Sequence, residues 1–249
     1  MISMQGYVAA LRPILDRLVD REAAGIARAA DLIAASLRDG GVLQAFGAGH
    51  SEVFAAELVA RAGGLVPTNQ LAVRDLVVYG GAAPRVLDDP KLERDPTIAH
   101  QIYALAAPQP RDVFVVASQS GINGSVVELA RLVKERGHHL IAVTSVEHTA
   151  RVPPRHPSGR RLAELADVVL DNGAPYGDAL LPLEGGGAVC AVSSVTAALL
   201  AQLLTAEVVR RFHLAGEAPP IYLSANVPGG DDHNHALESR YAGRIRRTA

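Results

Sequence analysis

The sequence predicts an α/β fold: a parallel five-stranded sheet flanked by helices on both faces, arranged as a three-layer sandwich. Short apolar runs alternate with segments of helical periodicity along the 249 residues, which is typical of such a sheet. The chain is 49% hydrophobic but only 4% aromatic, so small aliphatic side chains build the core, as suits helices packed on parallel strands. No long linker or internal repeat interrupts the alternation. We therefore expect a single domain over residues 1–249.

The elements of the first half follow in order. A helix is expected at residues 26–37, where apolar side chains recur every three or four positions. A strand at residues 42–46 leads into a glycine-rich loop and then a helix that Gly63 ends. The apolar run at residues 71–79 counts as the second strand. Residues 80–96 are rich in Gly, Pro and Asp and are expected to form a loop.

The second half repeats the alternation. One helix is expected at residues 98–106, and another begins where Ser125 and Glu128 have the spacing of a capping box. His138 and His139, at the start of a strand, are expected at the surface. The three remaining strands are expected at residues 112–117, 139–144 and 167–171.

One long stretch, residues 185–206, carries no charge. It could cross a bilayer by its length, but it begins with three glycines, contains Ser, Thr and Gln, and continues into Glu207 and Arg210. We expect instead a helix buried on one face by the sheet and on another by a partner subunit. A homodimer or higher homo-oligomer is therefore expected. A tail rich in Pro, Gly and His follows from about residue 216 to residue 249.

Composition excludes several classes of partner. A net charge of −2 and a pI near 6.5 give no bulk attraction to nucleic acid or to anionic lipid. The one cysteine, Cys190, cannot form an intrachain disulfide. The first residues lack the apolar segment of a signal peptide, so a cytoplasmic protein is expected. No strand leads into a dinucleotide fingerprint or a Walker loop, and no cofactor is expected.

Two loops at the ends of predicted strands contain the candidate binding residues. Each leads into a helix, whose free N–H groups and positive dipole end attract anions. Either loop alone could be a simple turn with a helix cap. Two donor-rich helix starts at carboxyl ends of strands favour one shared phosphate site. The first loop contains Gly49, His50 and Ser51, and the second contains Ser118, Gln119, Ser120, Gly121 and Asn123.

These loops resemble those of the sugar isomerase (SIS) domain family, over roughly residues 20–215, and the second loop is the more specific. The family usually has threonine where this chain has Asn123. The resemblance implies that the phosphate of a sugar phosphate is held by Ser51, Ser118, Gln119, Ser120 and Asn123, with Gly121 allowing close backbone approach. Asp171, Asn172 and Asp178 follow the end of a predicted strand and are candidates for contacts with sugar hydroxyls, as are Gly49 and His50 in the first loop. The Asn172-Gly173 pair is equally a turn signal.

The resemblance extends to a narrower group. Residues 61–65, 155–159 and 171–173 are similar to those of a bacterial group of stand-alone SIS proteins of about this length, related to N-acetylmuramic acid 6-phosphate etherase. The chain has neither the glutaminase domain of glucosamine-6-phosphate synthase nor the helix-turn-helix segment of sugar-sensing regulators. The SIS reactions that remain are aldose–ketose isomerisation and β-elimination. Both begin by opening the sugar ring and removing the proton on C2.

These reactions need a carboxylate base and an acid–base group for ring opening. Glu57 is the candidate base, since its helix resembles the glutamate-bearing helix of SIS heptose-phosphate isomerases; alternatively it simply pairs with Arg61 at i+4. His233 and His235 are candidates for ring opening, because a histidine near the C-terminus reaches the site across the dimer in several SIS enzymes. His50 is the alternative. The tail matches no strong metal motif, so no metal site is expected.

The resemblance thus implies a lyase acting on an amino-sugar 6-phosphate. A dehydratase that eliminates water from N-acetylglucosamine 6-phosphate comes first, because the chain lacks residues of the typical etherase loop. The alternatives are an aldose–ketose isomerase, an etherase on N-acetylmuramic acid 6-phosphate, and a non-catalytic phosphosugar sensor. The expected partner is a small sugar phosphate, with no nucleic acid and no membrane.

Overall fold

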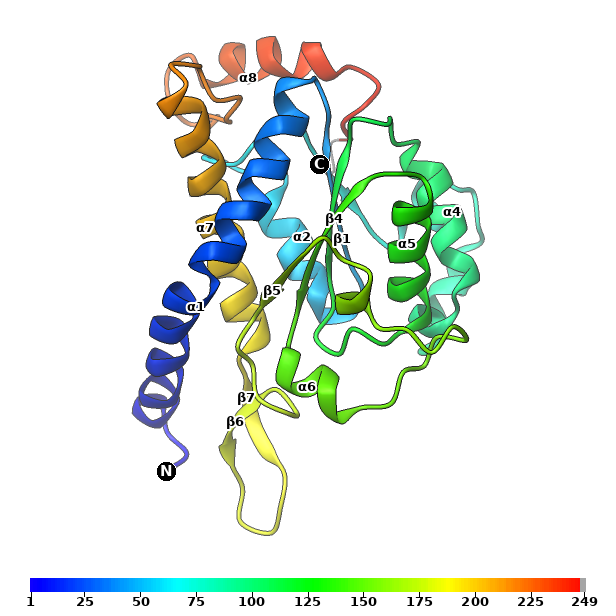
Figure 1. The fold of residues 1–249 in the computed structure, drawn as a ribbon, viewed down its shortest axis with the longest axis vertical. Helices are drawn as coiled ribbons and strands as arrows, with labels where there is room; N and C mark the ends of the chain where they lie inside the picture. Colours follow the sequence, from blue (N-terminus) through cyan, green and yellow to red (C-terminus); the bar gives the residue numbers. More distant parts are fainter. Residues whose placement is uncertain (247–249) are drawn as a thin grey trace.

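The computed structural model describes residues 1–246 and contains the predicted five-stranded sheet (Figure 1). The strands lie in the order β2-β1-β3-β4-β5, and every neighbouring pair is parallel. The prediction of a parallel α/β fold is therefore confirmed. The strands are β1 (Leu43–Gly47), β2 (Thr68–Leu71), β3 (Val113–Ala117), β4 (His139–Thr144) and β5 (Val168–Asp171).

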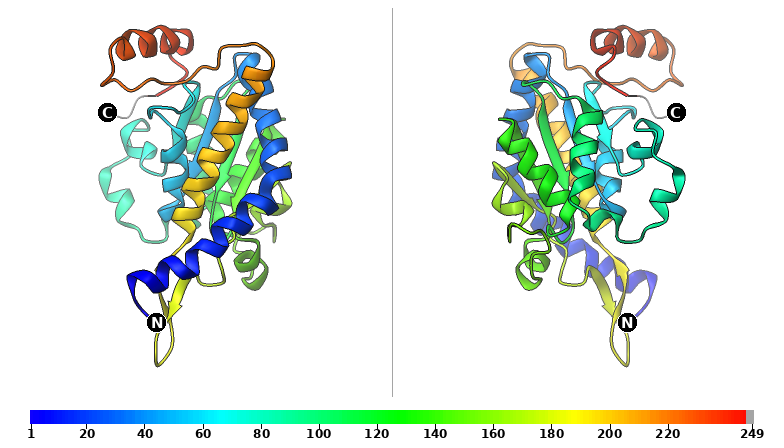
Figure 2. Two further views of the ribbon diagram at one scale, coloured as in Figure 1. Left: turned by 90° about the vertical axis from the view of Figure 1, so that its left-hand side faces the viewer. Right: turned by 90° about the vertical axis from the view of Figure 1, so that its right-hand side faces the viewer.

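Helices cover both faces of the sheet (Figure 2). Along β3, Val113 and Val115 enter the core on one face, whereas Phe114 and Val116 enter the core on the other, because successive side chains of a strand point to opposite sides. The first face is covered by α1 (Met4–Arg38), α2 (Glu52–Leu58) and α7 (Ser193–Leu214). The second is covered by α3 (Asp75–Val78), α4 (Thr97–Ala106) and α5 (Gly124–Glu135).

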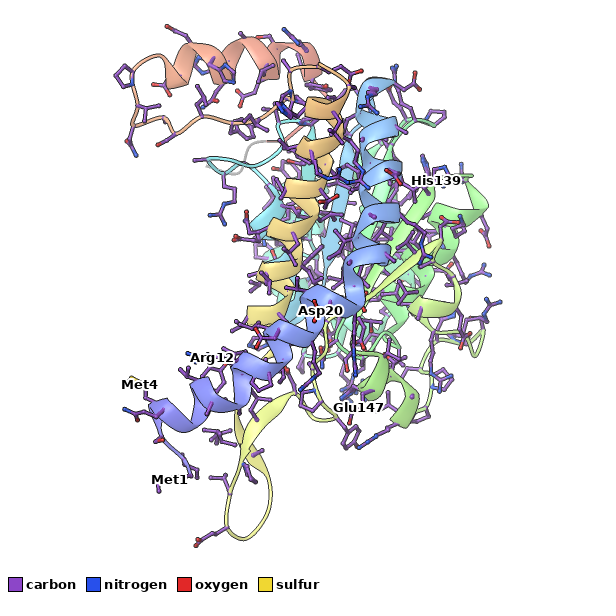
Figure 3. All side chains as sticks on the ribbon, turned by 60° about the vertical axis from the view of Figure 1, so that its left-hand side comes forward. Met1, Met4, Arg12, Asp20, His139 and Glu147 are labelled. Atoms are coloured by element: carbon purple, nitrogen blue, oxygen red, sulfur yellow. The ribbon has the colours of Figure 1, made fainter. Side chains whose placement is uncertain are left out.

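The long helix α1 extends beyond the sheet. Its C-terminal half buries apolar side chains such as Ile26, Ile33 and Leu37. Its N-terminal half projects past the carboxyl edge of the strands, beside the hairpin of β6 (Ala179–Pro182) and β7 (Ala188–Ala191) (Figure 1). Figure 3 shows Met1, Met4 and Arg12 along this projecting end. The Tyr7 hydroxyl ties it to the hairpin by donating to the Ala191 carbonyl over 3.0 Å.

The hairpin corrects the prediction of one helix over residues 185–206. Three consecutive glycines, 185–187, have φ between 80° and 108°, a conformation that glycine adopts at no steric cost. They form the turn of the hairpin, and α7 begins only at Ser193. One face of α7 is buried at Leu200 and Leu204, and Val195 is exposed. Contact of the exposed face with a partner subunit stays a prediction. Among residues 1–246 no helix has the length and apolar character needed to cross a bilayer.

Three smaller predictions are wrong. The second strand lies just before the apolar run at residues 71–79, most of which forms α3 and its flanking turns. Ser125 makes no capping box: α5 has Asn123 as its N-cap, and the Ser125 hydroxyl donates to the Glu93 carbonyl over 2.7 Å. His138 is 3% exposed and belongs to the interior.

The C-terminal segment, residues 217–246, returns to the amino edge of the sheet. It contains α8 (Gly230–Glu238), which lies at the opposite end of the molecule from the hairpin (Figure 1). The Asn69 side chain bonds the backbone of Arg244 and Arg246, and the Arg244 guanidinium pairs with the buried Asp112. The predicted tail is thus attached to the body. The shorter helices are α6 (Val146–Arg151), η1 (Gly49–Ser51), η2 (Pro84–Asp88), η3 (Leu92–Arg94), η4 (Leu162–Glu164) and η5 (Ser239–Tyr241).

Candidate functional site

The two sequence-predicted loops meet at the carboxyl edge of the sheet. Gly47 and Ala117 are register partners on β1 and β3, so η1 and the loop at residues 118–123 leave neighbouring strands. Ser51 does not cap α2 with its side chain. Its Oγ instead accepts a hydrogen bond from the Gln119 amide at 3.2 Å. This bond fastens one loop to the other.

A cavity of about 470 Å³ opens between these loops and the N-terminus of α7. The residues that line it come from segments far apart in the sequence. Those that the sequence indicated are Gly49, His50, Ser51, Ser118, Gln119, Ser120, Asn123 and Asp178. Those that it did not indicate include Glu93, Ser193 and Ser194.

The loop after β3 presents a free hydroxyl on a fixed turn. The Ser118 Oγ accepts a hydrogen bond from the Gly121 amide at 3.1 Å. Gly121 has a φ of 63°, and a Cβ there would lie 3.1 Å from the Thr144 hydroxyl. The glycine is therefore required by the turn and by packing on β4. The Ser120 hydroxyl bonds no other group among residues 1–246 and faces the cavity lining.

Gln119 carries an unsatisfied donor. Its Oε1 accepts a hydrogen bond from the Asn172 Nδ2 at 2.7 Å, whereas its Nε2 is buried without an acceptor in the part of the chain that the structure describes. Leaving such a group unpaired costs about 1–3 kcal/mol. Gln119 lines an inner recess together with Ser118, Asn172 and Ser193. A ligand oxygen in this recess would satisfy the donor.

The start of α7 forms a third wall of the cavity. Asp178 has a φ of 70° and turns its carboxylate toward the helix. It accepts hydrogen bonds from the Ser193 amide at 2.8 Å, the Ser193 hydroxyl at 2.6 Å and the Val192 amide at 3.2 Å. The carboxylate is thus engaged in capping, which is favourable at a helix N-terminus.

Asn123 joins two charged residues at the start of α5. Its Nδ2 donates to the Glu93 Oε1 at 2.9 Å, and its Oδ1 accepts from the Arg155 Nη1 at 3.0 Å. The carboxamide is therefore already bonded on both sides. The backbone N–H groups of the helix start remain for an anion. No spacing pattern marks Glu93 in the sequence, because it lies in a loop thirty residues before its partner.

A second groove adjoins the cavity at His50. It has a volume of about 500 Å³ and follows α2, with Val53 and Ala56 on its apolar side. On its polar side Glu52 pairs with Arg74 and accepts a hydrogen bond from Gln70. His50 and Gly49 line both spaces, so the groove and the cavity adjoin at these two residues.

A family model described as the SIS domain matches residues 6–145. The chain belongs to the SIS domain family. The family predicted from the two loops is thereby confirmed. A UPF0309 protein of Listeria monocytogenes serovar 1/2a is 39% identical over 94% of this chain and 95% of its own length. The match to the narrower group of stand-alone SIS proteins therefore spans nearly the whole sequence.

Solved structures share the SIS fold at low sequence identity. A phosphoheptose isomerase from Francisella tularensis has a TM-score of 0.55 and 17% identity, covering 83% of this chain and 96% of that one. The Vibrio vulnificus NanR protein complexed with ManNAc-6P has a TM-score of 0.51 and 17% identity, covering 94% of this chain and 65% of that one. At these identities the likeness establishes the fold.

Glu57, the predicted SIS base, does not line the cavity. It lies on α2, where its carboxylate pairs with Arg61 at i+4 and accepts a hydrogen bond from the Gln202 Nε2 at 2.6 Å. Its side chain is 24% exposed. The ion pair with Arg61, which the sequence offered as the alternative, is therefore present. A catalytic role for Glu57 stays a prediction.

Of the predicted histidines and Asp171, some lie at the cavity and others lie away from it. His50 lines the cavity, whereas His233 and His235 lie on α8 at the amino edge of the sheet, with the His233 Nε2 3.0 Å from the Ile221 carbonyl. Asp171 faces away from the recess that Asn172 lines, since its carboxylate accepts hydrogen bonds from the amides of residues 146 and 173. Among residues 1–246 no group of three or more His, Cys, Asp or Glu could hold a metal.

Proposed function

We propose that the protein binds a sugar phosphate in this cavity, with the phosphate on the helix starts that follow β1 and β3. The observation that carries this proposal is the bond from the Gln119 amide to the Ser51 hydroxyl, which joins the two helix starts. Around them the cavity keeps the free Ser120 hydroxyl and the unpaired Gln119 Nε2. Such N–H and O–H groups bind a phosphate without a net positive charge on the protein.

The proposed substrate is an amino-sugar 6-phosphate. The groove along α2 gives an N-acyl group an apolar wall at Val53 and Ala56, with hydrogen-bonding groups nearby at Gln70. The complex of Vibrio vulnificus NanR with ManNAc-6P supports this class, because that protein has the same fold. A phosphate in the cavity and an acyl group in the groove would place the sugar carbons beside His50.

The proposed reaction is the elimination of water from N-acetylglucosamine 6-phosphate. Ring opening gives a C1 aldehyde, which makes the C2 proton acidic. A carboxylate takes that proton, the C3–O bond breaks, and a C2=C3 double bond forms. A general acid donates a proton to the departing hydroxide, so that water leaves. We assign the ring opening and this proton donation to His50, because it lines both the cavity and the groove.

Isomerisation is the second candidate, favoured by the fold shared with the Francisella tularensis phosphoheptose isomerase. The two reactions share the removal of the C2 proton. Incubation with candidate sugar phosphates in D2O, followed by NMR, separates them. An unsaturated product is expected. A ketose that carries deuterium would instead establish the isomerase and exclude the lyase.

The binding step has its own test. Thermal-shift measurements with N-acetylglucosamine 6-phosphate, N-acetylmannosamine 6-phosphate, glucose 6-phosphate and the unphosphorylated sugars should raise Tm with a phosphorylated amino sugar alone. Ser120→Ala should abolish that rise, because it removes the free hydroxyl at the phosphate. Ser239→Ala is the matched control, since Ser239 lies beyond α8, outside the cavity lining, and its hydroxyl donates to the His235 carbonyl. No rise with any sugar phosphate would overturn the proposed site.

A further inference from the structure

Glu93 is the least expected residue of the cavity. It lies in η3, within the loop at residues 80–96, and it is attached to the first turn of α5 twice. The Ser125 hydroxyl donates to its backbone carbonyl at 2.7 Å, and the Asn123 Nδ2 donates to its Oε1 at 2.9 Å. The backbone and the side chain of Glu93 are therefore both held by the start of α5, where we propose that the phosphate binds.

The attachment leaves no space for movement toward α5. A Cβ on Gly124 would lie 2.0 Å from the Arg94 carbonyl oxygen, so the loop backbone touches the helix backbone directly. Only a glycine at this position permits that approach. The position of Glu93 relative to α5 is thus fixed by packing as well as by hydrogen bonds.

The Glu93 carboxylate lies between the two phosphate loops. Its Oε1 is bonded to Asn123 of the second loop. Its Oε2 lies 3.3 Å from where a Cβ on Gly49 of the first loop would be. The side chain lines the same cavity as His50, and it forms no ion pair with any Lys, Arg or His within residues 1–246. One carboxylate oxygen is therefore unengaged at the cavity.

The other carboxylates near the site are either ion-paired or bonded at both oxygens. Asp178 accepts three hydrogen bonds at the start of α7. Glu57 is bonded to Arg61 and Gln202 and lies outside the cavity. Glu52 is paired with Arg74 in the adjoining groove. A general base needs a free oxygen within reach of the proton that it takes. Of these four carboxylates, only Glu93 lines the cavity with one oxygen unbonded and without an ion pair among residues 1–246.

We propose that Glu93 is the base that removes the C2 proton of the bound sugar phosphate, with Asn123 as the residue that positions it. This inference rests on the proposed function. The electron pair of the C2–H bond forms the enolate of the C1 aldehyde, and the proton moves to the Glu93 Oε2. In the elimination the same electrons then form the C2=C3 bond as hydroxide leaves C3 with a proton from the general acid.

The test compares carboxamide variants of three glutamates. Deuterium uptake at C2 and product formation are followed by NMR in D2O with N-acetylglucosamine 6-phosphate, and binding by thermal shift. Glu93→Gln should lower the C2 chemistry, meaning the rates of deuterium uptake at C2 and of product formation, about 100-fold. It should leave the thermal shift in place, because the new carboxamide oxygen can still accept a hydrogen bond from Asn123. Glu93→Asp, which withdraws the carboxylate by one methylene, should lower the rate about 10-fold or more. Glu135→Gln, on the exposed end of α5, is the matched control.

The outcomes separate this inference from the proposed function. If the wild-type protein neither binds the sugar phosphate nor reacts at C2, the proposed function fails. If the wild-type protein reacts and Glu93→Gln reacts at the same rate, Glu93 is not the base. If Glu57→Gln abolishes C2 chemistry while Glu93→Gln does not, the base is the residue first indicated by the sequence.

Discussion

At the scale of single residues, the surroundings of the buried His138 favour its neutral form over its protonated form. The ring lies between the Asp112 carbonyl, 3.0 Å from its Nδ1, and the Tyr103 hydroxyl, 2.9 Å from its Nε2. A neutral imidazole satisfies both contacts, with Nδ1–H donating and Nε2 accepting from the phenol. Burial lowers the pKa of His138 below its usual value, against the opposing effect of the Asp112 carbonyl.

The lowered pKa determines in which direction the stability changes with pH. Below about pH 6.5 the unfolded chain binds a proton at this histidine more readily than the folded protein does. The contribution of His138 to the free energy of unfolding is therefore present at neutral pH and lost as the pH falls. His138→Gln should cost about 1–2 kcal/mol at pH 7.5, and urea denaturation should show this cost shrinking at pH 5.5.

A neighbouring histidine supplies the control for that measurement. His139 is the next residue, and its side chain is 62% exposed, so His139→Gln should lower the stability at pH 7.5 less than His138→Gln does. If the two variants have the same pH slope, the assignment of a neutral buried imidazole to His138 is wrong.

At the scale of elements, the contact between η3 and α5 determines whether Glu93 reaches the cavity. Gly124→Ala would place a methyl group against the Arg94 carbonyl and force η3 away from the helix. Overpacking of this kind costs about 1–3 kcal/mol. We expect a lower Tm together with C2 chemistry that falls more than sugar-phosphate binding does.

Ser125→Ala is the milder companion variant. It removes the hydrogen bond to the Glu93 carbonyl, worth about 1 kcal/mol, without adding any atom to the contact. Its effect on C2 chemistry should be smaller than that of Gly124→Ala and in the same direction. Full activity in Gly124→Ala, in a folded protein, would show that the position of η3 does not matter to the reaction.

The same elements show what the sequence can and cannot predict. β3 and β4 are continuous apolar runs, because both of their faces are buried, and a pattern reveals them directly. β2 has the sequence Thr-Asn-Gln-Leu, and two of its polar side chains bond to groups that are distant in the chain. The Asn69 Nδ2 donates to the Arg244 carbonyl, and the Gln70 Nε2 donates to the Glu52 carboxylate. The place of Glu93 beside Asn123 likewise arises only when remote segments fold together, so no local spacing indicates it. Asp178 is visible as a residue after a strand end, but its contacts with the start of α7 are not.

At the scale of the whole molecule, the phosphate loops and the C-terminal histidines lie at opposite edges of one sheet. α8 is held at the amino edge, since the Asn234 side chain bonds both the amide and the carbonyl of Leu223. His233 and His235 therefore act on a sugar phosphate only if another copy of the chain brings its amino edge to this cavity. The predicted homodimer and the predicted role of these histidines thus stand or fall together.

Mixing two inactive variants tests this pair of predictions. One carries His233→Ala and His235→Ala, and the other carries Ser120→Ala. If the histidines serve the partner's cavity, each mixed dimer has one complete site. Unfolding and refolding the two together should then restore about a quarter of the wild-type C2 chemistry, because half of the random dimers are mixed and one of their two sites is complete. No recovery would mean that the histidines do not serve a partner's cavity, and the predicted role of His233 and His235 across the dimer would be wrong. Full activity of the histidine variant alone would remove His233 and His235 from the mechanism, and sedimentation as a monomer would refute the dimer.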